Sequence, residues 1–393
     1  MSGTSSQRLL EIAQVFFKLG VIGFGGPAAH IAMMEEEVVT RREWITRSRF
    51  LDLIGATNLI PGPNSTEMAI HLGYIQGGFL GLIIAGVCFL IPAVTITGIF
   101  AWIYIAYGDL PEIAPLFYGI KPAVLAVILG ALWKLGKKAV KGYQFFLIGF
   151  GVAILLLLGI NEVIALIIGG FLGMLLLRKV LPKETAEGLI ATLSFGTILK
   201  AVAATTAKTI PTLWKLGLFF LKVGAILFGS GYVLIAFIEG ELVNQNSWLT
   251  QQQLLDAIAI GQLTPGPVLS TSTFIGYVIA GFPGAIVATI GIFFPSFIFV
   301  MILNPLIPKL RDSQWTSAFL DAVNVSAVGL MTVVTLQLAL NLFWEPLDSI
   351  AIFIFIISAI ALFRFKLGAP WLVLGGAILG LISTVNQSVS WAC

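Results

Sequence analysis

The chain has 393 residues, of which 58% are hydrophobic and 10% are charged, and its formal net charge at pH 7 is +3. Because soluble domains carry about 25% charged residues, this composition argues against a soluble enzyme or a nucleic-acid-binding protein and indicates a polytopic membrane protein. Two cysteines and two histidines are too few for a disulfide framework, a haem or a zinc site, so we expect no cofactor and no metal.

Long apolar segments follow one another along the chain and predict an all-α fold with six segments in each half. In the first half they lie at about 9–34, 50–75, 78–105, 116–133, 144–160 and 162–177, and in the second at about 212–237, 254–280, 284–303, 316–343, 348–363 and 370–390. We therefore divide the chain into an N-terminal half (1–177), a linker expected in the cytoplasm (178–211) and a C-terminal half (212–393).

The two halves are copies of each other, with a spacing of 204 residues that becomes 203 after a one-residue slip. A period of this length reflects a duplicated half-protein rather than a solenoid. In so apolar a chain, duplication with Gly/Pro-broken segments is typical of secondary transporters, whose binding site lies where the halves meet. Matching pairs include Lys18/Lys222, Gly20/Gly224, Glu35/Glu239, Trp44/Trp248, Pro61/Pro265, Gly62/Gly266, Pro63/Pro267, Gly73/Gly276 and Pro92/Pro295.

Basic residues mark the cytoplasmic ends of membrane segments. The stretch Arg41–Arg49 carries four arginines, whereas its copy, Glu239–Gln253, carries no basic residue and two glutamates. The same module is therefore expected in opposite orientations in the two halves, as in inverted-repeat transporters.

All basic loops, including Lys134–Lys141, lie inside only if each Pro-Gly-Pro segment dips into the membrane and returns. Each half then has five crossings and one re-entrant segment, and because five is odd the second half is inverted. Irregular backbone at membrane depth persists only where protein or a water-filled cavity covers it. The two Pro-Gly-Pro segments therefore predict a cavity.

Small residues in the first segment of each half predict a broken helix. Gly23, Gly25 and Gly26 precede Pro27, and a half-helix beginning there would direct unbonded N–H groups at an anion. After each Pro-Gly-Pro motif, residue types common at helix N-caps supply donors for a tetrahedral oxyanion. The candidate anion-binding residues are Lys18, Gly25, Gly26, Asn64, Ser65, Thr66, Lys222, Gly229, Ser230, Ser270 and Thr271.

These features also have purely structural interpretations. Glycine clusters let membrane helices pack closely, and Ser and Thr side chains cap helices. Lys18 and Lys222 can extend to the membrane surface instead of forming a positive pair near the pseudo-twofold axis.

Three carboxylates are candidates for coupling to protons: Glu35, Glu67 and Glu239. Glu67 has no acidic mate, since Thr271 stands at its position in the second half. An unpaired carboxylate at membrane depth could carry a proton. Glu35 and Glu239 also fit residues at loop edges.

The spacing of these motifs resembles the chromate ion transporter (CHR) family in its long two-domain form. Ser230 departs from the glycine at the matching Gly26 position, which makes the half-sites inequivalent. The resemblance implies efflux of chromate, a sulfate-like dianion, across the inner membrane, driven by membrane potential or a proton gradient, with chromate resistance as the result. It rests on Gly25, Gly26, Val39, Trp44, Pro61–Gly62–Pro63, Gly73 and Gly81, and on Trp248, Pro265–Gly266–Pro267, Gly276 and Gly284.

Other functions stay open at this point. A carrier or exchanger of sulfate, molybdate or another oxyanion fits the same residues, and a passive channel is a further alternative. An integral-membrane enzyme is less favoured, because the chain has only two histidines, two cysteines and no glycine-rich dinucleotide motif. The expected partners are an oxyanion, protons and the lipid bilayer. A homodimer is left open, and no nucleic acid is expected.

Overall fold

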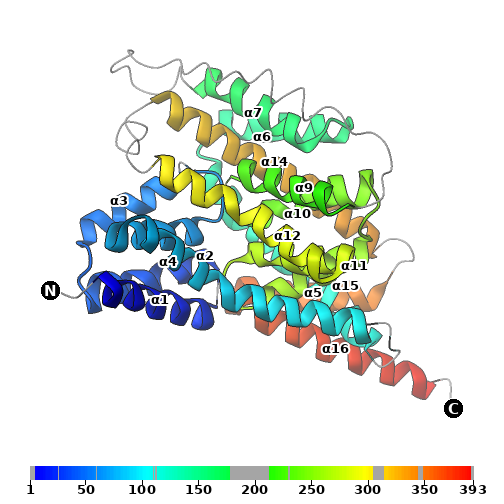
Figure 1. Cartoon of the computed structure of the whole chain (residues 1–393). Coiled ribbons are helices and arrows are strands. Elements are labelled where there is room, and N and C mark those ends of the chain that lie inside the picture. Colours follow the sequence, from blue (N-terminus) through cyan, green and yellow to red (C-terminus); the bar gives the residue numbers. More distant parts are fainter. Residues whose placement is uncertain are drawn as a thin grey trace.

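The computed structural model describes residues 5–24, 26–58, 60–108, 110, 113–177, 212–228, 231–303, 314–343 and 348–390, and in these ranges every regular element is helical. The predicted linker, 178–211, lies outside them. The first half contains α1 (Ser5–Ile22), α2 (Pro27–Glu35), η1 (Glu36–Arg41), α3 (Arg47–Thr57), α4 (Asn64–Tyr107), α5 (Ala114–Ala139), α6 (Tyr143–Leu157) and α7 (Glu162–Leu177) (Figure 1). The second contains α9 (Leu213–Ile226), η2 (Gly231–Val233), α10 (Leu234–Phe237), η3 (Ile238–Gln245), α11 (Gln251–Leu263), η4 (Val268–Ser270), α12 (Thr271–Leu303), α14 (Gln314–Phe343), α15 (Ser349–Phe365) and α16 (Ala369–Ser390).

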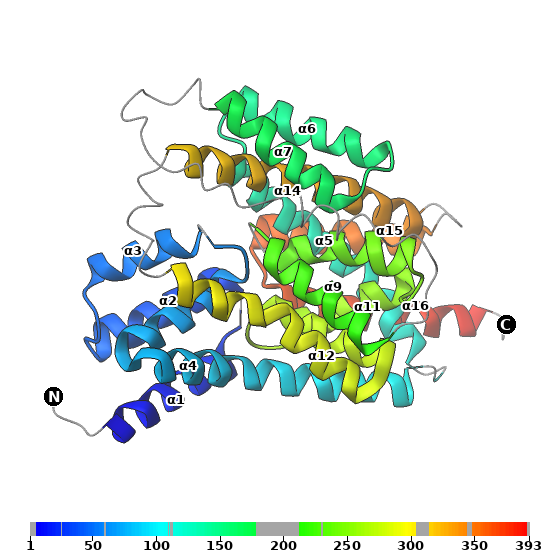
Figure 2. The same ribbon diagram turned by 45° about the horizontal axis from the view of Figure 1, so that its top comes forward.

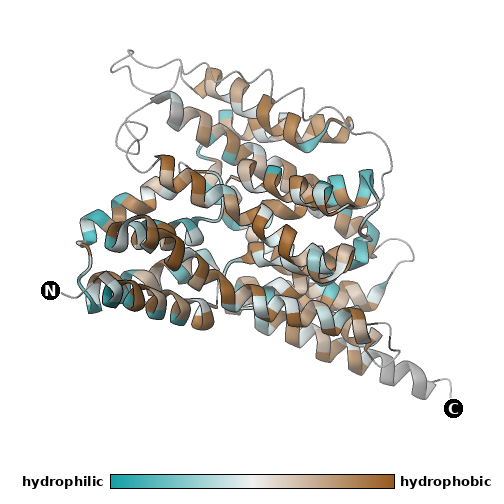
Figure 3. Cartoon of the chain, viewed as in Figure 1, coloured by the Kyte–Doolittle hydropathy of each residue, from teal (hydrophilic) through white to brown (hydrophobic). Residues whose placement is uncertain are grey.

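The helices carry a largely apolar surface. Four of them contain stretches long and apolar enough to cross a bilayer: Asn64–Tyr107, Ala114–Ala139, Val268–Ile302 and Ser317–Phe343. Hydrophobic residues run along most of the helices, whereas hydrophilic residues gather near their ends (Figure 3). Large side chains such as Trp102 and Phe294 are more than half exposed. A lipid environment accounts for this surface, so the protein is a multi-pass membrane protein.

Helix α4 is a helical hairpin rather than one rod. Its backbone leaves helical geometry at Gly77 and Gly78, and Gly78 has a φ of 60°. Gly73 packs directly against the backbone of Gly81 and the methyl group of Ala85. In a straight helix positions 73 and 85 would be about 18 Å apart, so the two arms are antiparallel.

The second half repeats this hairpin. Helix α12 leaves helical geometry at Ala280 and Gly281, and Gly276 packs against Gly284 and Ala288. The repetition at a spacing of 203 residues shows that the sequence duplication is a structural duplication.

The first segment of each half also turns back on itself. Lys18 Nζ lies 3.3 Å from Glu37 Oε2, and Arg42 pairs with Glu11. The earlier residue of α1, Glu11, thus pairs with the later residue, Arg42, and the later residue of α1, Lys18, pairs with the earlier one, Glu37. Helix α1 therefore runs antiparallel to α2 and η1. The single crossing predicted over 9–34 is wrong, because the break before Pro27 reverses the chain. Without this crossing the count of five crossings per half no longer holds. The inference that an odd number of crossings inverts the second half therefore loses its basis.

The remaining helices are exchanged between the halves. Helix α5 of the first half packs on α15 and α16, while α14 of the second half packs on α6 and α7 (Figure 2). Glycines allow the close crossings: Gly119 meets the backbone of Gly376, and Gly329 meets that of Gly149. The two halves are therefore interlocked, and each completes the packing of the other.

Candidate functional site

Two reciprocal hydrogen bonds fasten the halves together at their irregular segments. The Gly62 N–H donates to Leu227 O at 2.7 Å, and the Gly266 N–H donates to Gly23 O at 2.6 Å. Gly62 and Gly266 are repeat mates, as are Gly23 and Leu227. Each Pro-Gly-Pro turn is thus bonded to the point at which the first helix of the other half ends.

The predicted helix break is present. Helix α1 ends at Ile22, and α2 begins at Pro27 behind Gly26, whose φ is 79°. The His30 ring Nε2 lies 2.9 Å from Gly23 O, which ties the new helix to the broken end. The predicted site residues Gly25, Gly229 and Ser230 lie outside the described residues.

The Pro-Gly-Pro turns are joints between the halves. Their central N–H groups, on Gly62 and Gly266, are already bonded to carbonyl oxygens, so they are not free to donate to an anion. All six residues of the two motifs, Pro61, Gly62, Pro63, Pro265, Gly266 and Pro267, are buried.

Most of the predicted side-chain donors are buried beside these turns. Ser65, Thr66, Ser270 and Thr271 are at most 3% exposed. The Thr271 hydroxyl donates to Val268 O at 2.7 Å, which is a local capping bond. The hydroxyl oxygens of Ser65 and Thr66 have no hydrogen-bond partner among the described residues. Their role toward an anion stays a prediction, and it requires the turns to open.

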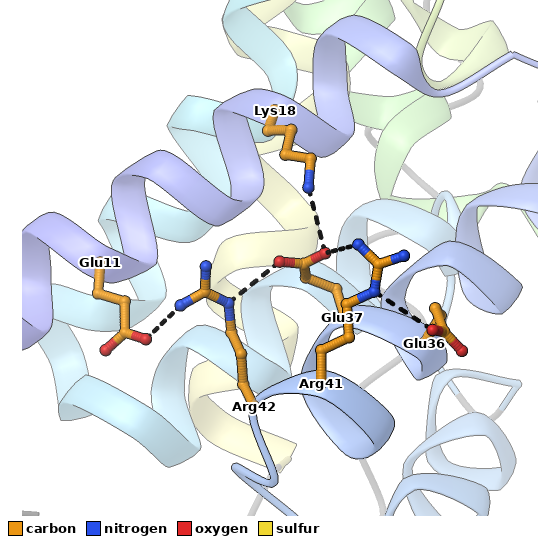
Figure 4. Close-up of polar contacts among 6 residues, drawn as sticks. All are labelled: Glu11, Lys18, Glu36, Glu37, Arg41 and Arg42. Atoms are coloured by element: carbon orange, nitrogen blue, oxygen red, sulfur yellow. Dashed lines mark hydrogen bonds and ion pairs between the residues drawn. The ribbon is translucent and has the colours of Figure 1, made fainter.

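Lys18 and Lys222 are each neutralised within their own half. Lys18 is bonded to Glu37 inside a network of three cations and three carboxylates, completed by Glu11, Glu36, Arg41 and Arg42 (Figure 4). Lys222 pairs with Glu241. Burial opposes ionisation of Glu37, but hydrogen bonds from Arg42 and Lys18 outweigh it and lower the pKa of Glu37. A role for either lysine at the anion stays a prediction.

The three predicted coupling carboxylates have different surroundings. Glu35 is paired with Arg47 at 3.0 Å and is partly exposed, as expected at a loop edge. Glu239 is 2% exposed, and its Oε2 has no partner among the described residues. Glu67 is fully buried and has no ion-pair partner in the described part of the chain, and the Ser296 hydroxyl is the polar group that lies beside its carboxyl. Of the three, Glu67 is the most isolated from compensating charge.

The two turns differ in what packs against their glycines. Glu67 and Ser296 lie against the face of Gly62 where a Cβ would stand, whereas Ala93 lies against that face of Gly266. Ser296 and Ala93 are repeat mates, as are Glu67 and Thr271. The first half therefore keeps an acid and a hydroxyl at its turn, where the second half has a methyl group and a threonine.

A cavity of about 360 Å³ lies beside the first Pro-Gly-Pro turn. Of the predicted site residues that the structure describes, only Asn64 lines it. The Lys141 ammonium lies 2.7 Å from Asp321 at its edge and joins the end of α5 to α14. The sequence analysis uses Lys138 and Lys141 only as markers of membrane side and does not single out the other polar lining residues. The remaining polar lining residues are Asn58, Lys138, Ser317 and Asn324.

The fold and site define a class: an all-helical, multi-pass membrane protein of two interlocked repeats, joined at broken helices and proline-flanked turns. The chain belongs to the chromate transporter family, whose model matches residues 10–174 and 214–381, one copy in each repeat. The family is one of transporters.

Relatives similar to this chain cover nearly its whole length. It is 32% identical over 95% of both chains to a probable chromate transport protein of Synechococcus elongatus. It is 30% identical to chromate transport proteins of Cupriavidus metallidurans, over 95% of this chain and 93% of the relative, and of Pseudomonas aeruginosa, over 95% and 92%. No solved structure matches the chain.

Proposed function

We propose that the protein is a secondary carrier that exports chromate, or a sulfate-like oxyanion of the same shape and charge, across the inner membrane. The observation that carries this is the reciprocal bonding of each Pro-Gly-Pro turn to the broken first helix of the other repeat, in a chain of the chromate transporter family. Irregular backbone at the interface of two repeats is where such carriers hold their substrate.

The driving force follows from the charge of the substrate. Moving a dianion out of a cell that is negative inside releases about 4.6 kcal/mol per 100 mV, since each charge contributes about 2.3 kcal/mol. Export driven by the membrane potential therefore needs no nucleotide hydrolysis. A proton carried by Glu67 would make the pH gradient a second driving force. Chromate resistance is the physiological consequence.

The carrier would alternate between two sides through inverted repeats. This is supported by the charge difference between the two tryptophan loops and by the packing of α4 on α12. Gly86 meets Phe297, while Leu82, earlier in α4, clusters with Val300, later in α12. The second arms of the two hairpins are therefore antiparallel, which is the relation expected between inverted mates.

The orientation can be checked by labelling. Ser48 and Gln252 are repeat mates and exposed second positions of α3 and α11. In a background without Cys88 and Cys393, cysteines at these positions are expected to react with an impermeant maleimide from opposite sides of the membrane. Labelling of both from one side would contradict the inverted arrangement.

The function itself is tested by flux. Purified full-length protein in proteoliposomes is expected to move radiolabelled chromate in a saturable manner when a potassium diffusion potential is imposed. Competition by sulfate and molybdate decides whether the site prefers chromate or accepts tetrahedral dianions generally. Saturable movement that ignores both potential and pH gradient would argue for exchange, and non-saturable movement for a channel.

A further inference from the structure

The cavity beside the first Pro-Gly-Pro turn reaches the junction of the two repeats. Ile60 and Asn64, on either side of the turn, line it. Val233, which follows the break in the first helix of the second repeat, lines it too. A ligand in this cavity would touch both elements that the reciprocal hydrogen bonds fasten together.

The polar lining is rich in donors. The Asn64 Nδ2 donates to Asn58 Oδ1 at 3.0 Å, and the Asn58 Nδ2 donates to Ile54 O at 2.8 Å. Each amide NH₂ group carries two hydrogens, so both keep one N–H for a ligand. Asn324 adds a third amide from α14.

The charges favour an anion. Lys138 and Lys141 line the cavity, and among the described residues Asp321 is the one acid that does. Both carboxylate oxygens of Asp321 lie 2.7 Å from the Lys141 ammonium. Lys138 has no ion pair with any described residue, so it leaves the cavity with uncompensated positive charge.

We propose that this cavity binds a tetrahedral oxyanion dianion on the basic, cytoplasmic side, through Lys138 and the amides of Asn58, Asn64 and Asn324. Asp321 competes with the anion for Lys141. The proposal rests on the proposed function and names the place where the carrier receives its substrate. The cavity volume of about 360 Å³ leaves room for a tetrahedral oxyanion.

The polar residues that line this cavity at the first turn have different counterparts in the second repeat. Gln262, the mate of Asn58, is 7% exposed and accepts a hydrogen bond from the Tyr232 hydroxyl at 3.0 Å. Val268 replaces Asn64. The amide donors at Asn58 and Asn64 are therefore specific to the first repeat.

If Asp321 competes with the anion for Lys141, removing the Asp321 charge should strengthen anion binding. Equilibrium dialysis of radiolabelled sulfate and chromate against the purified full-length protein is expected to show a Kd about tenfold higher for Lys138→Gln, the loss of one charged hydrogen-bond donor. Asp321→Asn should lower the Kd severalfold, because it frees Lys141. Misfolding cannot produce that gain. Asn324→Leu should raise the Kd without changing net charge.

Lys137→Gln is the matched control, since Lys137 stands at the same helix end but lies 4.9 Å from the Trp133 ring centroid and does not line the cavity. Its Kd should equal that of the unmodified protein. Unchanged Kd values in Lys138→Gln and Asp321→Asn, with normal binding by the unmodified protein, would overturn the cavity assignment alone. An unmodified protein that binds and transports neither anion would overturn the proposed function as well.

Discussion

Alanine at Gly266 is expected to abolish oxyanion flux in proteoliposomes while the protein still reaches the membrane. Gly266 has a φ of 91°, in the left-handed region that residues with a Cβ rarely adopt. The added Cβ would stand 2.7 Å from the Cβ of Ala93, although carbon atoms in contact are about 3.5–4.0 Å apart. The turn would have to move, and the bond from Gly266 to Gly23 would be lost. Strain of this kind costs about 1–3 kcal/mol.

Gly62→Ala should reduce flux less severely. Its φ of 139° is also unfavourable, but the Cβ would meet the ends of the Glu67 and Ser296 side chains, which can rotate away. Gly98→Ala is the control, because Gly98 is in the same helix as Ala93 and has no atom within 4 Å of its Cβ position. Normal flux in Gly266→Ala, with the thermal stability of the control, would reduce the Pro-Gly-Pro turn to a packing element.

The duplication and the broken helices could be predicted from the sequence, because the types and positions of the residues alone reveal both features. A copied Pro-Gly-Pro motif needs no structure to be recognised, and a run of glycines before Pro27 specifies a break by backbone geometry alone. The structure adds that the copies fold alike, down to the hairpins at Gly78 and Gly281.

The path of the chain could not be predicted in the same way. Hydropathy measures the length of an apolar segment and not its direction, so 9–34 was interpreted as one crossing. Its reversal depends on contacts of α1 with residues beyond α2, such as Lys18 with Glu37. The exchange of α5 and α14 between the halves likewise arises from packing between distant segments.

The cavity could not be predicted from the sequence for a related reason. Its polar residues lie at the ends of α3 and α5 and in α4 and α14. Residues as distant in the chain as Asn58 and Asn324 form no sequence motif that would reveal the site. Lys138 and Lys141 were visible only as part of a basic loop. A sign of the cavity is present in the repeat comparison, since Asn64, which lines it, is polar where its mate is Val268.

These differences show that the repeats have diverged in chemistry while keeping their geometry. The first turn has Asn64, Glu67 and Ser296 where the second has Val268, Thr271 and Ala93. A carrier with two inverted halves can alternate by geometry alone, but coupling to an ion needs a group that senses only one step. We propose that a polar residue at the first turn supplies it.

Glu67→Gln is therefore expected to uncouple the carrier from the proton gradient. An ionised carboxylate buried without a compensating charge is costly, so Glu67 should be neutral while the turn is closed and should release its proton when the turn opens to water. Glutamine has the same size and hydrogen-bonding shape but cannot release a proton. Flux driven by a pH gradient should fall at least tenfold, to the level of empty vesicles, while potential-driven flux persists.

Two other carboxylates complete this experiment. Glu35→Gln should leave the response to the pH gradient intact, because Glu35 is bound to Arg47 near the surface, and Glu239→Gln tests the buried mate of Glu35 in the second repeat. Loss of both kinds of flux in Glu67→Gln, with a lowered melting temperature, would assign Glu67 a structural role. Full pH-driven flux in Glu67→Gln together with its loss in Glu239→Gln would move the coupling group to the second repeat. The comparison works because the three side chains differ in burial and pairing, and only an unpaired buried acid can couple its proton to the opening of the turn.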